Sequence, residues 1–423
     1  MSYKKWVNAE IDKAKASALS EKLNIDAFVA FLLVSRGIDD ELAASEFLSD
    51  GCRFSSPYLL KDMDKAVKRI NRALDDGESI CIYGDYDCDG VTSTALLYTF
   101  LSALGGFVSY YIPNRATDGY GMNFKAIDKI KADGTDLIIT VDNGISSIEE
   151  AEYIYSLGMQ LIVTDHHQIG ENLPRAEAVI NPHREDNEIE FRDFAGVGVA
   201  FKLACALYDG DVEDLLEDYA DYVTIGTIGD MVPLLNENRA IVKAGLKLIN
   251  TDAKIGISAL KKSTNSKAEH FSATDVAFQI CPRINAAGRM DTANLAVDLL
   301  TCEDNEIAEY KAEQLNLENT HRHEVEEKID KDIAEIMAND RAYQTDRVIV
   351  VAGHNYHKGV IGICAAHLVE LYSKPAIVIG IDDEGNATGS ARSIDGFNIF
   401  EAISSCSDIL THFGGHPCCR YGA

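Results

Sequence analysis

The sequence predicts an α/β protein in which a doubly wound parallel-sheet domain is joined by a long helix to a smaller α/β domain. From about residue 57 to residue 290, short runs of β-branched residues alternate with helix-like segments, and this alternation is typical of parallel sheets. Residues 303–339 are rich in Glu, Lys and His and contain no Gly or Pro, as expected for a single long helix. A second alternation begins with the run RVIVVAG at residues 347–353.

Four segments are expected along the chain. Residues 1–54 contain the helix-like apolar runs IDAFVAFLLVSRG and ELAASEFLS, and we expect them to form a helical cap. Residues 55–300 are expected to form the larger domain, and residues 301–343 the connecting helix. Residues 344–423 are expected to form the smaller α/β domain.

The strand-forming runs are short and apolar, which is typical of parallel strands that are buried on both faces. The helix-like segments between them provide the connections that parallel strands require. The expected elements, in chain order, are strand 80–83, helix 91–104, strand 108–112, helix 123–131, strand 347–353, helix 360–372 and strand 376–379.

Composition indicates an ordinary globular protein of 423 residues, which is long enough for two or three domains. No apolar run approaches the roughly 18 residues that a membrane span needs, and the first residues lack the apolar core of a signal peptide. Ten cysteines occur without a zinc-type CxxC pair, and a chain of this size needs no disulfides. We therefore expect a cytoplasmic protein, and we expect it to be a monomer.

The formal net charge of −29 argues against a broad nucleic-acid-binding surface, because such surfaces are usually basic. Several of the acidic residues belong to the metal site that we infer below. If the protein binds a nucleic acid, we expect the binding to be confined to a narrow channel.

Acidic residues and histidines gather in four short motifs, three of which directly follow strand-like runs. The motifs are SICIYGDYDCDG, LIITVDNG, LIVTDHHQ and TIGTIGDMVPL. Because the carboxyl ends of parallel strands line one crevice, side chains at these ends are expected to converge. The converging residues would be Asp85, Asp87, Asp89, Asp142, Asp165 and Asp230, with His166 and His167 beside them.

So many carboxylates in one place repel each other unless positive charge lies among them. Carboxylate and imidazole ligands suit Mn²⁺ or Mg²⁺ better than a structural zinc ion. The set exceeds what one ion needs, so we expect two ions that act on a phosphate ester. Alternation along an extended GDYDCDG segment would place its three aspartates on one side and Cys88 on the other. The amides of residues 90–93 would open the next helix and help to hold a phosphate.

Each motif also has a plain structural interpretation. GDYDCDG resembles an Asp- and Gly-rich surface loop, Asp142 before Asn143-Gly144 resembles a turn former, and Asp230 resembles the end of a helix. A pair of adjacent histidines at a strand end is more specific. The joint occurrence of all four motifs favours the metal site over coincidence.

The motifs GDYDCDGVTSTALL, VDNGIS, VTDHH and GTIGDMVPL, in this order, resemble those of the DHH phosphoesterases. PNRATDGYGMN, GVGVAFKL and PRINAAGRM favour the branch of exonucleases specific for single-stranded DNA. GHNYHKGVIGICAAHL, GSARS and GGHP resemble the DHH-associated domain. The resemblance covers roughly residues 59–417.

The resemblance implies metal-dependent hydrolysis of single-stranded DNA from its 5′ end, in DNA repair and recombination. It implies a single-strand-binding protein and a helicase as further candidate partners. The implied metal set, in which Asp165 supports the others, is Asp85, Asp87, Asp89, Asp142, Asp165, His166, His167 and Asp230. Asp142, His166 and His167 are also the expected catalytic residues. The expected substrate- and phosphate-binding residues are Arg283, Asn285, Arg289, Ser390, Arg392 and His416, with His354, His357 and Lys358 as weaker candidates.

The chain departs from the family at its end. Members of the branch continue GGHP with two alanines and a glycine and then carry an oligonucleotide-binding barrel. Here residues 418–423 read CCRYGA. A one-base shift in the reading frame would restore the family's residues, so we expect a frameshifted or truncated product.

Other functions fit parts of this pattern. A DHH-type phosphodiesterase acting on very short oligonucleotides or cyclic dinucleotides is the main alternative, and the acidic charge favours it. A scaffold with an inactive site would lack ligands, but none of the expected ligands is missing. An inorganic pyrophosphatase fits least well, because the motifs of the second lobe are typical of nucleic-acid enzymes.

Overall fold

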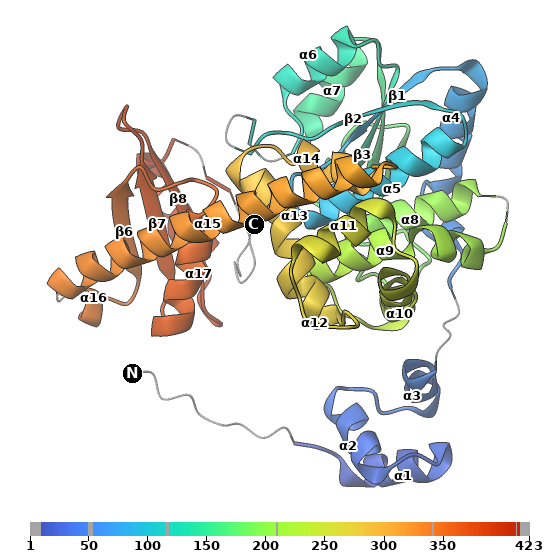
Figure 1. Ribbon diagram of the computed structural model, residues 1–423, viewed down its shortest axis with the longest axis horizontal. Coiled ribbons are helices and arrows are strands. Elements are labelled where there is room, and N and C mark those ends of the chain that lie inside the picture. The colour runs from blue at the N-terminus through green and yellow to red at the C-terminus, as the bar shows by residue number, and fades with distance from the viewer. Residues whose placement is uncertain are drawn as a thin grey trace.

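The computed structural model describes residues 10–49, 54–115, 118–119, 121–208, 210–340, 342–411 and 413–414. Its largest unit is built on a five-stranded parallel sheet with the strand order β2-β1-β3-β4-β5. The strands are β1 (Ser79–Tyr83), β2 (Phe107–Tyr111), β3 (Leu137–Val141), β4 (Gln160–Thr164) and β5 (Ala178–Ile180). The predicted doubly wound parallel sheet is confirmed (Figure 1).

Helices cover both faces of this sheet. One face packs on α4 (Met63–Asp76), α5 (Cys88–Ala103) and α8 (Gly196–Leu207), and the other on α6 (Phe124–Ala132) and α7 (Ile148–Ser156). The pleat separates neighbouring residues: Ile82 belongs to the first core, and Tyr83 to the second. Every residue of β3 is buried, which explains its uninterrupted apolar run.

The predicted alternation of strands and helices ends earlier than residue 290. After β5, the described residues up to residue 300 form helices and no strand. Apart from α8, these are α9 (Val212–Gly229), α10 (Asn236–Thr251), α11 (Ile255–Ser263), α12 (Ala273–Asp275), the π-helical turn η2 (Val276–Ile280), α13 (Cys281–Met290) and α14 (Asn294–Leu300). They extend the larger core on the α5 side.

The predicted long helix is confirmed as α15 (Asn305–Asn339), which spans 35 residues and runs from the larger lobe to the smaller one (Figure 1). Its buried residues recur every three or four positions, as on one face of a helix. Ala308, Ala312 and Leu315 pack into the core of the larger lobe, and Ile329 and Ile333 into that of the smaller.

The smaller lobe contains a three-stranded sheet in which β6 (Ile349–His354) is parallel to β7 (Ala376–Ile381), and β7 is antiparallel to β8 (Ala387–Arg392). Helix α17 (Ile361–Tyr372) packs on this sheet together with α15. The short elements α16 (Ala342–Thr345), α18 (Ile399–Ser404) and η3 (Ser407–Ile409) complete the lobe. The sequence did not predict β8.

The N-terminal segment contains α1 (Lys13–Leu23), α2 (Ala27–Ser35) and α3 (Glu41–Leu48), which share a small core of their own and lie apart from both sheets (Figure 1). The 3₁₀ turn η1 (Pro57–Leu59) precedes α4. The domain boundaries at residues 54, 300 and 343 stay predictions. Among the described residues, none of the helices combines the length and the apolar character that crossing a bilayer requires.

Candidate metal centre

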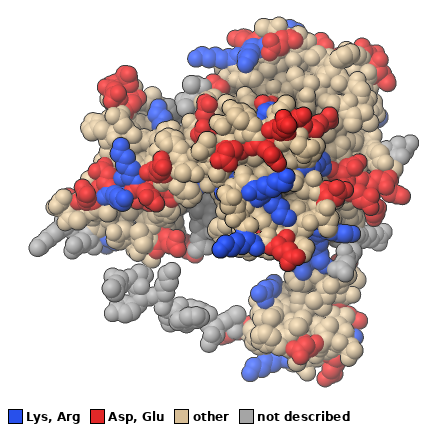
Figure 2. Space-filling view, viewed as in Figure 1, with Lys and Arg blue, Asp and Glu red and all other residues tan. Residues whose placement is uncertain are grey.

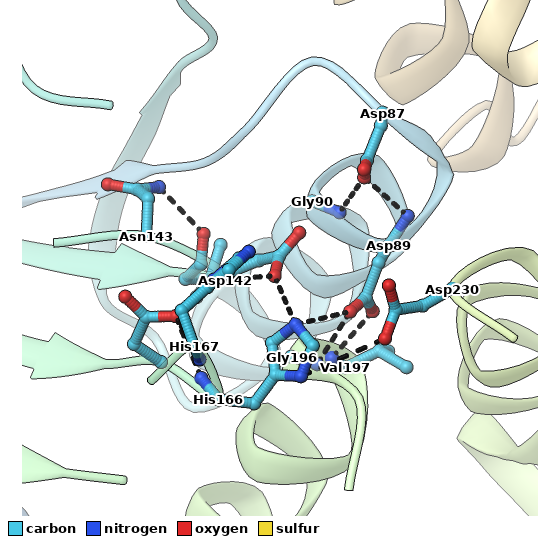
Figure 3. Close-up of polar contacts among 12 residues, drawn as sticks. Asp87, Asp89, Gly90, Asp142, Asn143, His166, His167, Gly196, Val197 and Asp230 are labelled. Carbon is cyan, nitrogen blue, oxygen red and sulfur yellow. Dashed lines mark hydrogen bonds and ion pairs between the residues drawn. The ribbon is translucent and has the colours of Figure 1, made fainter. Parts of the chain in front are cut away.

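Four loops or helix ends bring the predicted ligands together at the carboxyl edge of the sheet (Figure 3). The GDYDCDG motif follows β1, Asp142 follows β3, and the histidine pair follows β4. Asp230 caps the end of α9, which is why its motif did not follow a strand. The predicted convergence is therefore present, although the fourth motif reaches it from a helix.

The prediction from alternation assumed that the whole GDYDCDG motif is extended. In the structure it is not. Helix α5 begins at Cys88, and Asp87 caps it by accepting hydrogen bonds from the amides of Asp89 (2.9 Å) and Gly90 (3.1 Å). Asp89 therefore lies in the first turn of the helix. The phosphate-binding role predicted for the amides of residues 90–93 is wrong, because Asp87 occupies the first of these amides and the helix begins before them.

Asp89 connects the first motif to α8. Its carboxylate accepts hydrogen bonds from the amides of Gly196 (2.6 Å) and Val197 (2.8 Å), the first two residues of that helix. A Cβ at Gly196 would lie 2.6 Å from Cβ of Asp142, so only glycine fits there. The GVGVAFKL stretch thus borders the site, and the N-terminus of α8, which it forms, favours negative charge there.

His166 lies in the middle of the cluster (Figure 3). Its Nε2 is 3.0 Å from Oδ1 of Asp142 and 3.8 Å from Oδ2 of Asp89. Its Nδ1 is 3.8 Å from Oδ2 of Asp230. One imidazole therefore faces three carboxylates from three separate parts of the chain.

Asp165 forms hydrogen bonds with the histidine pair and with the loop after β3. Its Oδ1 accepts hydrogen bonds from the amides of His166 (2.7 Å) and His167 (3.1 Å) and lies 2.8 Å from Nδ1 of His167. Its Oδ2 accepts a hydrogen bond from the amide of Ile145 (2.9 Å). Asp165 also belongs to none of the described clusters of ligand atoms that could hold an ion, so the geometry favours a role in orienting the histidines over direct metal binding. Such an outer partner is usual for a metal-binding histidine.

The donor set fits divalent cations. Three groups in this region have ligand atoms within 4.8 Å of one another. Oδ1 of Asp85 and Oδ1 of Asp142 are buried and accept no hydrogen bond, a costly state that a cation would relieve. The groups are Asp142 with His166 and His167, Asp89 with His166 and Asp230, and Asp85 with Asp87 and Asp142. Because they share members, they suit two neighbouring ions.

Burial and mutual repulsion raise the pKa of several of these carboxyls. Burial, followed by the charge of Asp87, raises the pKa of Asp89 to about 7. Burial, followed by the charge of Asp89, raises the pKa of Asp230 to about 8. The pKa values of Asp85 and Asp142 are also raised well above their usual range, mainly by burial. The site therefore holds protons that a bound cation would displace.

The two histidines are shifted in opposite directions. Burial, with the charge of His167, lowers the pKa of His166 to about 3, so His166 is neutral at physiological pH. Burial alone would lower the pKa of His167, but the hydrogen bond and charge of Asp165 raise it to about 9. Burial would also raise the pKa of Asp165, but the bond to His167 holds it below its usual value.

These shifts predict that the metal-free protein loses stability as the pH rises. The folded pKa values of Asp89 and Asp230 exceed the unfolded value of about 3.9, so the folded state holds more protons. This contribution is fully present below that unfolded value and is lost as the pH passes through about 7 and about 8. Melting temperatures measured with EDTA should therefore fall as the pH rises from about 4 to about 8.

The same shifts predict that Mn²⁺ binding near neutral pH releases a measurable number of protons, from Asp230, His167 and the other carboxyls whose pKa is raised. Isothermal titration calorimetry in two buffers with different ionisation enthalpies measures this number. Binding without proton release would contradict the assignment of these groups to the metal centre.

The predicted phosphate-binding residues separate into two groups. Arg289 belongs to a set of mutually repelling arginines: burial, followed by the charges of Arg115 and Arg322, lowers its pKa to about 10. Ser390 and Arg392 are on β8, where Nη1 of Arg392 donates to Oγ of Ser390 (3.2 Å). A Cβ at Gly362 on α17 would lie 2.9 Å from each of these side chains. An anion would relieve the repulsion among these arginines.

Arg283 and Asn285 have other partners than those predicted. Nε of Arg283 donates to the side chain of Asn316 (3.0 Å) and its Nη1 to the carbonyl of Gln279 (2.6 Å), so the residue ties α13 to α15. Asn285 accepts the amide of Cys88 (2.8 Å). These side chains hold helices together, which favours a structural role for both over the predicted contact with the substrate. His416 lies outside the described residues.

Arg115, in the PNRATDGYGMN segment, was not among the predicted site residues. The guanidinium lies 5.2 Å from the ring centroid of Tyr86, in a cation–π contact beside the first motif. Arg115, Arg289, His357 and Lys358 line a cavity of about 460 Å³ between the lobes, and Asp291 and Asp382 line it as well. No local feature of the sequence indicates this contact, because Tyr86 and Arg115 come from separate segments. His354 does not line this cavity.

Comparison with protein families gives two matches. The model described as "DHH family, N-terminal domain" matches residues 79–227, and the model of the DHHA1 domain matches residues 345–419. The first match contains β1 to β5, most of α9 and every member of the predicted metal set except Asp230. The second covers the sheet of the smaller lobe.

Comparison with individual proteins points the same way. The chain is 43% identical, over 98% of its own length, to the single-stranded-DNA-specific exonuclease RecJ of Bacillus subtilis, and it spans 52% of that relative. A crystal structure of RecJ from Thermus thermophilus in complex with Mn²⁺ is similar with a TM-score of 0.81 and 30% identity, over 97% of this chain and 58% of that one. A structure of exonuclease RecJ bound to manganese gives a TM-score of 0.74 and 33% identity, over 86% and 90%.

Proposed function

This chain belongs to the RecJ family, and on that premise we propose that it is a metal-dependent exonuclease that degrades single-stranded DNA from the 5′ end. The observation that carries the proposal is the set of three overlapping ligand groups joined by Asp142 and His166. Manganese-bound relatives of the same fold support it. The chain spans about half the length of the first curated relative that it matches.

We propose that Mn²⁺ or Mg²⁺ binds to Asp85, Asp87, Asp89, Asp142, His166, His167 and Asp230. When bound, such ions polarise a phosphodiester and activate water for in-line displacement. Asp165 keeps His167 in one orientation through its Nδ1, and the amides of α8 hold the carboxylate of Asp89. These contacts preorganise the ligands before substrate arrives.

Across the cleft, we propose that Arg115, Arg289, Arg392 and Ser390 bind the 5′ phosphate. Arginine suits this role because its planar fork matches phosphate oxygens. Figure 2 shows acidic groups spread over the visible face, with Lys and Arg groups interspersed and no continuous basic surface. This distribution agrees with a substrate path confined to the cleft between the lobes, as the charge of −29 suggested.

We further propose that the protein acts in the cytoplasm as a monomer, on single strands exposed during DNA repair and recombination. A single-strand-binding protein and a helicase are the proposed partners, because they expose and cover such strands. The resemblance to bacterial RecJ proteins supports this setting.

A time course with oligonucleotides labelled at the 5′ or the 3′ end, single- and double-stranded, in Mn²⁺ tests the proposal. Immediate release of the 5′ label as a mononucleotide, from single strands only, is expected. Release of the 3′ label first would contradict the direction, and equal rates on duplexes would contradict the specificity. Cleavage of dinucleotides or cyclic dinucleotides alone would favour the alternative phosphodiesterase, which the acidic charge supports.

A further inference from the structure

Helix α13 touches the metal-binding motif along one side. The side chain of Asn285 accepts the amide of Cys88, and a Cβ at Gly288 would lie only 2.2 Å from the carbonyl oxygen of Tyr86. Cβ atoms in proteins do not approach backbone so closely. The backbone of α13 therefore rests directly on the segment that carries Asp85, Asp87 and Asp89.

The end of the same helix touches the smaller lobe. A Cβ at Gly359 would lie 2.2 Å from the carbonyl oxygen of Arg289, and Nη1 of Arg289 donates to the carbonyl of Gly359 (3.1 Å). The neighbouring Met290 packs against the core of that lobe. This contact is again between backbones, and no flexible side chain lies between them to absorb a displacement.

The loop after β2 reinforces the arrangement. Nδ2 of Asn114 donates to the carbonyl of Asp291, directly after α13 (3.0 Å), and the next residue, Arg115, lies over the ring of Tyr86. Two independent segments thus hold the end of α13 in place. The metal motif, α13 and the smaller lobe form one chain of contacts.

We propose that α13 is a rigid spacer that sets the distance between the metal centre and the phosphate-binding residues of the smaller lobe, Ser390 and Arg392, with Gly288 and Gly359 as its positioning residues. The inference rests on the proposed function, since it is this distance that selects which phosphodiester lies at the metal centre when the 5′ phosphate is bound. Catalysis depends steeply on such placement, and a displacement of about 1 Å can cost about 100-fold.

The first test is Gly359→Ala, which adds one methyl group at the contact with Arg289. We expect kcat/KM on a 5′-phosphorylated single strand to fall by roughly 100-fold, while the Kd for Mn²⁺, measured by calorimetry, changes by less than about twofold. Gly170→Ala is the matched control, because no atom lies within 4 Å of the position that a Cβ would take there and its φ is not positive. Unchanged kcat/KM in Gly359→Ala would overturn the proposal.

Gly288→Ala tests the other end of the spacer. The added methyl group pushes against the carbonyl of Tyr86 within the metal motif, so we expect both kcat/KM and Mn²⁺ affinity to fall. If Gly288→Ala and Gly359→Ala lower the Mn²⁺ affinity equally, the contact with the smaller lobe affects the metal centre as much as the contact with the metal motif does. That result would refute the spacer.

Hydrogen-exchange mass spectrometry keeps this test independent of the substrate. In Gly359→Ala, exchange should increase in residues 281–291 and 355–362 and stay unchanged in residues 79–87. Met290→Ala, which loosens the same contact without a clash, should give the same pattern if Gly359→Ala does not fold. Unchanged exchange in both variants overturns the spacer even in a protein that does degrade single strands. Altered exchange in a protein inactive on DNA would instead refute only the proposed function.

Discussion

Asp142→Asn is expected to lower the turnover of single-stranded DNA by about a thousandfold or more, because metal-assisted charge stabilisation contributes several kcal/mol to the transition state. Asp142 is a member of two ligand groups, and its Oδ1 is buried without accepting a hydrogen bond. Single-turnover kinetics with excess enzyme in Mn²⁺ measure the effect without the contribution of product release.

The same substitution should not destabilise the metal-free protein. Burial and four neighbouring aspartates raise the pKa of Asp142 well above its usual range. The folded protein therefore loses stability as the pH rises and this carboxyl is ionised. A neutral amide removes this cost, and the melting temperature in EDTA at about pH 8 should be equal to or higher than that of the unchanged protein. Asp133→Asn, an exposed aspartate after α6, is the control. Retained turnover in Asp142→Asn would mean that the active site lies elsewhere.

Arg289→Ala is expected to lower kcat/KM on 5′-phosphorylated single strands by roughly 10- to 100-fold, since hydrogen bonds to charged groups contribute about 1.5–3 kcal/mol. The effect on strands with a 5′ hydroxyl should be smaller. Arg289→Lys should restore little, because an ammonium group lacks the planar fork. The backbone contact with Gly359 persists in both variants, but Arg289→Ala also loses the hydrogen bond from Nη1 to the Gly359 carbonyl. The contribution of phosphate binding is therefore the difference between the effects on strands with a 5′ phosphate and strands with a 5′ hydroxyl.

Arg283→Ala provides the matched control on the same helix. Its guanidinium is bonded to Asn316 and to the carbonyl of Gln279, so we expect some loss of thermal stability and the same preference for a 5′ phosphate as in the unchanged protein. A loss of that preference in Arg283→Ala, with none in Arg289→Ala, would reverse our assignment of the two arginines.

The strands of the metal-binding lobe were predictable because their signals are local. A run such as LIITV is apolar at every position since both faces of the sheet are covered, and the residue that follows it must lie at the carboxyl edge. Asp142, His166 and His167 could be placed by this reasoning. The left-handed conformation of Asp142 (φ 60°) and the close packing of Gly196 against its side chain were not predicted.

Predictions about individual side chains failed where the partner comes from a distant part of the chain. The three aspartates of the first motif are alike in sequence, yet Asp87 caps its own helix while Asp89 binds the N-terminus of α8. The two arginines of α13 differ in the same way, since Arg283 is hydrogen-bonded to α15 and Arg289 to the smaller lobe. Sequence spacing carries no information about which distant residue becomes the hydrogen-bond partner of a side chain.

The sequence by itself determined the fold class, the family and the composition of the metal site, because apolar periodicity and strand-end motifs are properties of short segments. Only the tertiary structure decided which carboxylates gather at the metal site and which of them also bind helix ends or histidines. Only the tertiary structure, likewise, revealed α13 as a contact between the lobes. These outcomes depend on which backbone amides and carbonyls come within hydrogen-bonding or van der Waals distance, and packing sets those distances across more than a hundred residues of chain, as between Asp89 and Gly196.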